Sequence, residues 1–271
     1  MSKNNFVLIR GGGDLATGVA LRLHRAGIRV MISELPLPLA VRRTVSFAEA
    51  VYKGSHLVEG VLARLVEPYQ IPAWEEANEI PLLIDPNADI LLQNQFIALV
   101  DARLTKQTPD PIPTPVPLHI GLGPGFTAGR NCHAVVETRR SHTLGRVYWT
   151  GTAQPDSGEP EGDPRRVLRA TIDGVVVATK NIGEHVIENE LIATIQAEAE
   201  TSTPIYSPFS GILRGLIHPG LRVNKGLKIG DVDARDDTSV CYLVSDKALA
   251  IGGGVLEALL SKVNIRDQLF H

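Results

Sequence analysis

The chain has 271 residues, of which 44% are hydrophobic and 21% charged, and its formal net charge is -3. This composition predicts a well-buried core, and the absence of a basic stripe argues against a nucleic-acid surface. Two cysteines, Cys132 and Cys241, are too few for a disulfide framework or a zinc site, so we expect no metal site. The first apolar run, Phe6 to Ile9, is too short for a signal peptide or a membrane span. We therefore expect a cytoplasmic protein with no membrane partner.

The first informative stretch is "FVLIRGGGDLATGVALRLHRAGIRVMISE". Its apolar opening run is typical of a buried parallel strand. Gly11, Gly13 and Ala16 then fit G-x-G-x-x-A, the pattern of dinucleotide-binding turns. Helical spacing continues to Ala26, Gly27 ends the helix, and residues 29–32 indicate a second strand. This order predicts a Rossmann-like unit.

The turn after the first strand is the candidate cofactor site. In this interpretation phosphate lies at the helix N-terminus, and Glu34 binds a ribose hydroxyl at the end of the second strand. The alternative is that the glycines serve packing alone. Asp14 would repel a nearby pyrophosphate, so it could instead cap the helix or face a cation or another ligand. The predicted binding residues of this turn are Gly11, Gly12, Gly13, Asp14, Leu15 and Ala16.

Polar residues follow the next predicted elements. Arg42 and Arg43 precede a short helix pattern, "VSFAEAVYKG", and could hold an anion or simply begin a solvated helix. The segments "IPLLIDP" and "FIALVDARL" indicate buried strands that end near Asp85 and near Asp101 and Arg103. Ligands collect at the carboxyl ends of parallel strands. Asp101 and Arg103 are therefore the candidate catalytic residues, as acid/base and anion-holding groups, although such acids often serve turns.

A second glycine-rich stretch is "LHIGLGPGFTAGRNCHAVVETRR". Its backbone N–H groups could form an anion-binding nest, or the stretch could be an ordinary loop. Cys132 and His133 are adjacent in sequence and point apart on most backbones, so a covalent mechanism is not favoured. The predicted binding residues of this loop are Gly121, Gly123, Gly125, Phe126 and Thr127.

The C-terminal part begins after an acidic, Pro- and Gly-rich linker, 153–166. Glycine and valine positions then repeat at an offset of 37, as in Gly174 and Gly211. Such a repeat indicates a pseudo-symmetric β-sandwich over 167–236. It resembles biotinyl/lipoyl domains. The hairpin "QAEAETSTPI" between the halves has no lysine, so a carrier role is not expected.

The sequence therefore predicts an α/β fold with a Rossmann-like nucleotide-binding domain, 1–152, and a second, mostly β, biotinyl/lipoyl-like sandwich. In the last part, 237–271, we expect a strand over Val240 to Val244, a glycine turn at 252–254 and then a helix. This part could pack back on the N-terminal domain.

Four blocks together resemble one known family: "GGGDLATGVALRLHRAGIRV", "AVRRTVSFAEAVY", "GLGPGFTAG" and "SDKALAIGGGVLEALL". They are similar to the selenium-dependent molybdenum hydroxylase maturation proteins, over nearly the whole chain. The resemblance implies an accessory protein that serves an apo-hydroxylase partner.

Two hypotheses follow for the function. The first is a non-catalytic maturation factor that holds a nucleotide or the molybdopterin cofactor at its glycine loops. The second is an NAD(P)- or FAD-dependent oxidoreductase of the same pathway. Both require a small phosphate-bearing ligand, and the glycine loops do not distinguish a dinucleotide from molybdopterin.

Overall fold

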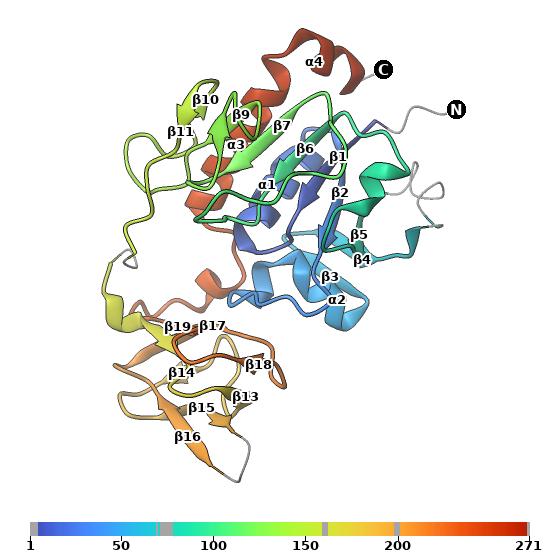
Figure 1. Ribbon diagram of the computed structural model, residues 1–271. Helices are drawn as coiled ribbons and strands as arrows, with labels where there is room; N and C mark the ends of the chain where they lie inside the picture. The colour runs from blue at the N-terminus through green and yellow to red at the C-terminus, as the bar shows by residue number, and fades with distance from the viewer. Residues whose placement is uncertain (1–4, 69, 71–77, 159–161, 198–200, 270–271) are drawn as a thin grey trace. The chain divides into compact units, whose positions relative to one another are not determined.

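The computed structural model describes residues 5–68, 70, 78–158, 162–197 and 201–269 (Figure 1). The chain divides into two compact units. Unit 1 consists of residues 1–38, 46–157 and 244–271, and unit 2 consists of residues 39–45 and 158–243. The predicted linker, 153–166, and the predicted hairpin, 196–205, lie partly outside the described residues.

Unit 1 is built on one nine-stranded sheet with the order β10-β9-β7-β6-β1-β2-β5-β4-β3. The pairs from β9 to β4 are parallel, whereas β10 and β3 pair antiparallel at the two edges. The strands are β1 (Phe6–Arg10), β2 (Arg29–Glu34), β3 (Ser55–Val58), β4 (Val61–Leu65), β5 (Ile80–Ile84), β6 (Ala98–Asp101), β7 (His119–Leu122), β9 (Ala134–Val136) and β10 (Val147–Tyr148). Strands β8 (Thr127–Ala128) and β11 (Gly151–Thr152) form a separate pair.

The predicted strand–helix–strand unit at the start of the chain is confirmed. Strand β1 is buried along its whole length, α1 (Asp14–Arg25) follows the glycine turn, and β2 pairs parallel with β1. Continuous apolar runs suit these strands because both faces of the sheet are covered.

Loops and short helices cover the face of the sheet opposite α1. Their core includes Leu8, Met31 and Leu99, packed with residues of η4 (Asp89–Leu92) and with Val116. Residues 55–65 form the hairpin β3–β4, which turns at Glu59 and Gly60, both with positive φ. The predicted short helix consists of η2 (Phe47–Glu49) and α2 (Ala50–Lys53), which Gly54 ends in the left-handed conformation.

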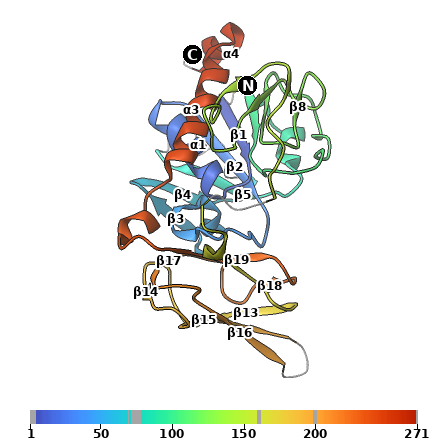
Figure 2. The same ribbon diagram turned by 90° about the vertical axis from the view of Figure 1, so that its left-hand side faces the viewer.

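The C-terminal helix α3 (Asp246–Leu260) packs against α1 (Figure 2) and is followed by α4 (Val263–Leu269). Here the structure corrects two predictions. Residues 252–254 lie inside α3 rather than in a turn before it, and 238–241 form the short helix η6 instead of a strand. The reason is close packing: a Cβ on Gly252 would lie 2.8 Å from the carbonyl oxygen of Gly18 on α1.

Three adjacent glycines of α3 provide a matched stability test. A Cβ on Gly254 would clash with the backbone at Gly145 and lie 2.9 Å from Val136, whereas a Cβ on the exposed Gly253 would meet nothing within 4 Å. We expect Gly254→Ala to lower the free energy of unfolding by about 1–3 kcal/mol through overpacking. Gly253→Ala should raise it by about 0.5–1 kcal/mol, since alanine favours helix. Urea unfolding of both variants measures this, and equal effects would refute the packing role.

Unit 2 contains two four-stranded antiparallel sheets, β12-β19-β17-β14 and β16-β15-β13-β18. Strands β13, β14 and β15 begin at 174, 185 and 191, and β17, β18 and β19 begin 37 residues later, at 211, 222 and 228. The predicted repeat is therefore confirmed. The short strands are exchanged, because β14 pairs with β17 and β18 pairs with β13. The strands are β12 (Val167–Arg169), β13 (Gly174–Ala178), β14 (His185–Val186), β15 (Leu191–Gln196), β16 (Ser202–Tyr206), β17 (Gly211–Leu216), β18 (Arg222–Val223) and β19 (Lys228–Asp233).

The predicted fold class needs correction. Unit 1 has a mixed sheet, and α1 is the only long helix that connects two of its parallel strands among the described residues. Strand β6 follows β5 through η4, and β7 follows β6 through a segment without helix, whereas a Rossmann fold places helices on both faces. The glycine pattern specified only the local β1–α1–β2 unit, and the repeat specified only strand positions. The fold is thus mixed α/β, not a Rossmann-like domain plus a lipoyl-like barrel.

Within the described part of the chain, no single helix is long and apolar enough to cross a membrane. Helices α3 and α4 pass that test of length and composition only as a pair, and they are bent by 103°.

Candidate functional site

The candidate site lies at the carboxyl edge of the sheet in unit 1. There Ser33 of β2, Arg10 of β1 and Asp101 of β6 occupy neighbouring positions in register, and Gly121 of β7 continues the row. In-register residues of parallel strands point to the same face of a sheet. Arg10, Ser33 and Asp101 are each at most 5% exposed. A polar row at this edge is where α/β proteins bind ligands.

The glycine turn after β1 is held by its own backbone and by Glu34. Gly11 has a φ of +98° and donates to the carbonyl of Ser33 at 2.7 Å. Gly12 donates to Glu34 Oε2 at 2.6 Å, and a Cβ on Gly12 would lie 3.0 Å from the nitrogen of Ala48. The first two glycines therefore serve the turn itself.

Gly13 differs from its two neighbours. It is the N-cap of α1 and supplies no side-chain cap, and a Cβ placed on it would meet nothing within 4 Å. Leu15 donates its backbone N–H to Asp14 Oδ1 at 3.0 Å, and Ala16 is buried against the fold. The helix start is thus open beside Gly13, with the carboxylate of Asp14 on its first turn.

Glu34 lies where the sequence predicted an acid, and it contacts the turn. Its two oxygens accept backbone hydrogen bonds from Gly12 and from Leu35, at 2.6 and 2.7 Å. Burial raises the pKa of this carboxyl, and the two backbone hydrogen bonds oppose that shift. Glu34 therefore fixes the shape of the turn.

The buried Asp101 forms an ion pair with the half-buried Arg103. Arg103 Nε lies 2.9 Å from Asp101 Oδ1, and Arg103 Nη2 lies 2.7 Å from Oδ2. Arg10 is farther away, since its Nη1 lies 4.0 Å from Asp101 Oδ2 and its Nη2 donates to the carbonyl of Pro86 at 2.7 Å. Both oxygens of Asp101 are thus engaged by Arg103. Asp85 accepts the N–H groups of Asp89 and Ile90 and so caps η4.

His119 lies on the same face, one step below this row on β7. It is in register with Leu99, it is 5% exposed, and its ring packs edge-on against Phe126 with centroids 5.9 Å apart. Burial lowers the pKa of His119 to about 4, and the field of Asp101 opposes that shift. At neutral pH the ring is uncharged.

In the second glycine loop, residues 121–129, backbone N–H groups donate hydrogen bonds to acceptors of the protein itself. Gly123 donates to Val136, Gly125 donates to Thr105, and Thr127 donates to Asn131 Oδ1, at 3.2, 2.9 and 2.7 Å. The ring of Phe126 occupies the space where Gly121 would carry a Cβ. These contacts make it a packing loop.

Cys132 and His133 do not form a nucleophile and base. Burial raises the pKa of the Cys132 thiol to about 11, so little thiolate is present at neutral pH. The Nδ1 atom of His133 accepts the backbone N–H of His119 at 2.9 Å.

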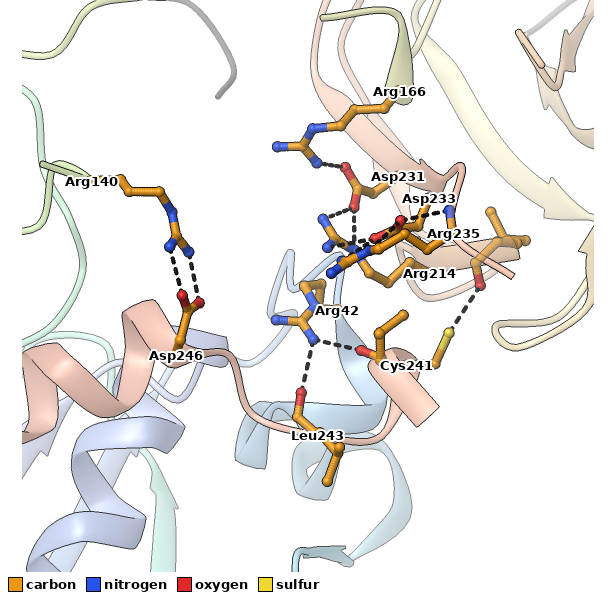
Figure 3. A network of polar contacts seen from close by, with 12 residues as sticks. Arg42, Arg140, Arg166, Arg214, Asp231, Asp233, Arg235, Cys241, Leu243 and Asp246 are labelled. Carbon is orange, nitrogen blue, oxygen red and sulfur yellow. Dashed lines mark hydrogen bonds and ion pairs between the residues drawn. The ribbon is translucent and has the colours of Figure 1, made fainter. Parts of the chain in front are cut away.

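The paired arginines belong to unit 2, where both donate to backbone carbonyls. Arg42 Nη2 donates to Val240 and Leu243, each at 3.0 Å (Figure 3), and Arg43 Nε donates to Leu216 at 2.7 Å.

Figure 3 also shows the buried carboxylate of Asp231, which is paired with Arg166 and Arg214. Its neighbour Asp233 contacts Arg214 and Arg235. The hydrogen bond from Arg235 lowers the pKa of Asp233 to about 2. Among the described residues of both units, no group of three His, Cys, Asp or Glu could hold a metal ion.

Comparisons with known proteins give one curated relative. No protein-family model matches the chain. Over 264 residues it is 45% identical to the uncharacterized protein YqeB of Escherichia coli strain K12. That match covers 96% of the chain and 48% of the relative, so the chain spans about half the length of this protein.

Among solved structures, the apo ectoine utilization protein EutE of Ruegeria pomeroyi is 11% identical, with 85% of this chain and 86% of that chain covered and a TM-score of 0.27. An aspartoacylase family protein of Mesorhizobium loti is 11% identical, with 85% of each chain covered and a TM-score of 0.28. Scores this low carry no argument about this chain.

The predicted family and both predicted functions need correction. No family model matches the chain, and the curated relative is named only as an uncharacterized protein, so neither the molybdenum hydroxylase maturation family nor an oxidoreductase is supported. The blocks that carried the resemblance include Gly18, Gly125 and Gly252, which the structure uses for close packing. Packing glycines do not specify a pathway, and neither function is carried further.

The sequence analysis missed Arg10, Ser33 and His119. Arg10 closes an otherwise apolar buried run, and that position in the central strand was a usable signal. Ser33 and His119 carried no signal of their own, because only strand register brings them to the same face as Arg10.

Proposed function

We propose that unit 1 binds a small phosphate-bearing molecule at the carboxyl edge of its sheet, with the phosphate over Gly13 and the first turn of α1. The observation that carries this proposal is the contrast between Gly13 and Gly12. A side chain at Gly12 would meet Ala48 and Glu34, whereas a side chain at Gly13 would enter open space at an uncapped helix N-terminus.

The surrounding residues support a phosphate at this position. Backbone N–H groups and the helix dipole attract an anion to the N-terminus of a helix. Glu34 and the positive φ of Gly11 hold the turn in place without ligand. The Asp14 carboxylate weakens the attraction, so we expect binding of moderate strength.

Gly13→Asp separates the binding role of the turn from its structural role. Gly13 has a φ of -65° and extended backbone, which aspartate adopts readily. An N-cap aspartate supports a helix at least as well as glycine, by a few tenths of a kcal/mol. The variant should therefore be as stable as the wild type, while its carboxylate occupies the phosphate position. We expect the thermal stabilisation by inorganic pyrophosphate and by AMP to disappear.

Gly253→Asp is the control, because it adds the same charge at an exposed helical position with open space. It should keep the response to both probes. An unchanged response in Gly13→Asp would overturn the proposal and leave the turn with a structural role only.

A further inference from the structure

We propose that Arg10 and Ser33 form a second subsite, which takes a carboxylate group of the ligand on the face of the sheet opposite α1. This inference deepens the proposed function by naming a second functional group of the same ligand.

The first argument is the hydrogen bonding of Arg10. A guanidinium carries five N–H donors. Within the described part of the chain, Arg10 Nη2 donates to Pro86, while Nε and Nη1 have no hydrogen-bond partner. The side chain is only 7% exposed. Buried donors of this kind are normally satisfied, so a ligand oxygen is the partner we infer.

The second argument is charge. Arg103 takes both oxygens of Asp101, so Arg10 has no carboxylate within hydrogen-bond distance. The negative charges of Asp85 and Asp110 also act on Arg10 and raise its pKa. Asp85 is only partly buried and caps η4, and Asp110 is exposed. Burial and Arg103 together outweigh all three acids and lower the pKa of Arg10. The buried cation is undercompensated, and a single negative charge would balance it.

The third argument is the set of neighbours. Ser33 lies in register beside Arg10, and its buried Oγ also has no hydrogen-bond partner among the described residues. A hydroxyl can donate to an oxyanion. One cation with one neutral donor suits a monoanionic carboxylate better than a phosphate dianion, which would need a second positive charge.

The test uses sodium formate as the probe, with sodium chloride at equal ionic strength as the reference. We expect a saturable rise in melting temperature for the wild-type protein. In Arg10→Met the apparent affinity for formate should fall at least tenfold, while the response to pyrophosphate remains. If Arg10→Met does not fold, Arg10→Lys keeps the charge but loses the Nε and Nη1 donors, and the same loss is expected.

The variant Gly13→Asp distinguishes a failure of the proposed phosphate position from a failure of the carboxylate subsite. It should abolish the pyrophosphate response and leave the formate response unchanged. If pyrophosphate still stabilises Gly13→Asp, the proposed phosphate position fails while the formate result still decides the subsite. No saturable response to formate in the wild type, or an equal response in Arg10→Met, would overturn the subsite.

Discussion

Replacing Asp101 with alanine is expected to lower the free energy of unfolding of unit 1 by about 3–5 kcal/mol, the usual cost of leaving a buried charge, here Arg10, without its counter-charge. Asp101 is fully buried, binds Arg103 through both oxygens and lies beside Arg10. Without it, two neighbouring guanidinium groups lose their shared counter-charge. Urea unfolding followed by tryptophan fluorescence measures the change, since Trp149 lies in unit 1.

The matched control is Asp156→Ala. Asp156 pairs with Lys106 through exposed side chains, and exposed pairs contribute at most about 1 kcal/mol. In the Asp101→Ala background, Arg10→Met should restore part of the lost stability, because it removes one of the two uncompensated cations. A loss in Asp101→Ala no larger than that in Asp156→Ala would show that the buried carboxylate of Asp101 is not needed for the fold.

The second large effect is a pH dependence caused by His119. Because burial lowers its pKa from 6.5 to about 4, the folded state favours the neutral ring. The contribution of His119 to the free energy of unfolding is fully present above pH 6.5, where its ring is neutral in the unfolded chain too. This contribution is lost as pH falls toward 4. The shift corresponds to roughly 3 kcal/mol over this range. We expect His119→Gln to lose correspondingly less stability between pH 7 and pH 4.

Comparing His119→Gln with the wild type cancels the contributions of the other titratable groups to the pH dependence of stability. Glu34, whose pKa is raised, changes stability in the opposite direction as pH falls, but it does so in both proteins. The pKa of Asp233 is lowered to about 2, so the stability that it contributes begins to fall near the lower end of the range, where the unfolded carboxyl takes up its proton, and it does so equally in both proteins. Between pH 7 and pH 8 the two proteins should differ by a constant amount. Parallel profiles down to pH 4 would mean that His119 is not buried as the structure shows.

Local features of the fold followed from the sequence. The β1–α1–β2 unit was predictable because its turn glycines, its helix spacing and its apolar strands are all short-range signals. The glycines of α3 misled the prediction, because their role depends on a contact with α1 more than 200 residues earlier in the chain. Helix propensity alone favours a turn at three glycines, and tertiary packing overrides it.

The candidate site was only half predictable. Glu34 and Asp101 stood at strand ends, where acids are visible in a sequence, but their partners were not. Glu34 binds the glycine turn, and Asp101 is neutralised by Arg103. The row of Ser33, Arg10 and Asp101 depends on the order β2-β1-β6, in which strands distant in sequence become neighbours.

The central claim is that the open helix start beside Gly13 binds a phosphate group. The most direct test is a titration of the wild-type protein with inorganic pyrophosphate, followed by the ³¹P resonance of the ligand. We predict saturable broadening and displacement of the signal with a stoichiometry of about one, and no change with Gly13→Asp. An unperturbed pyrophosphate signal with the wild-type protein at millimolar concentration would contradict the claim.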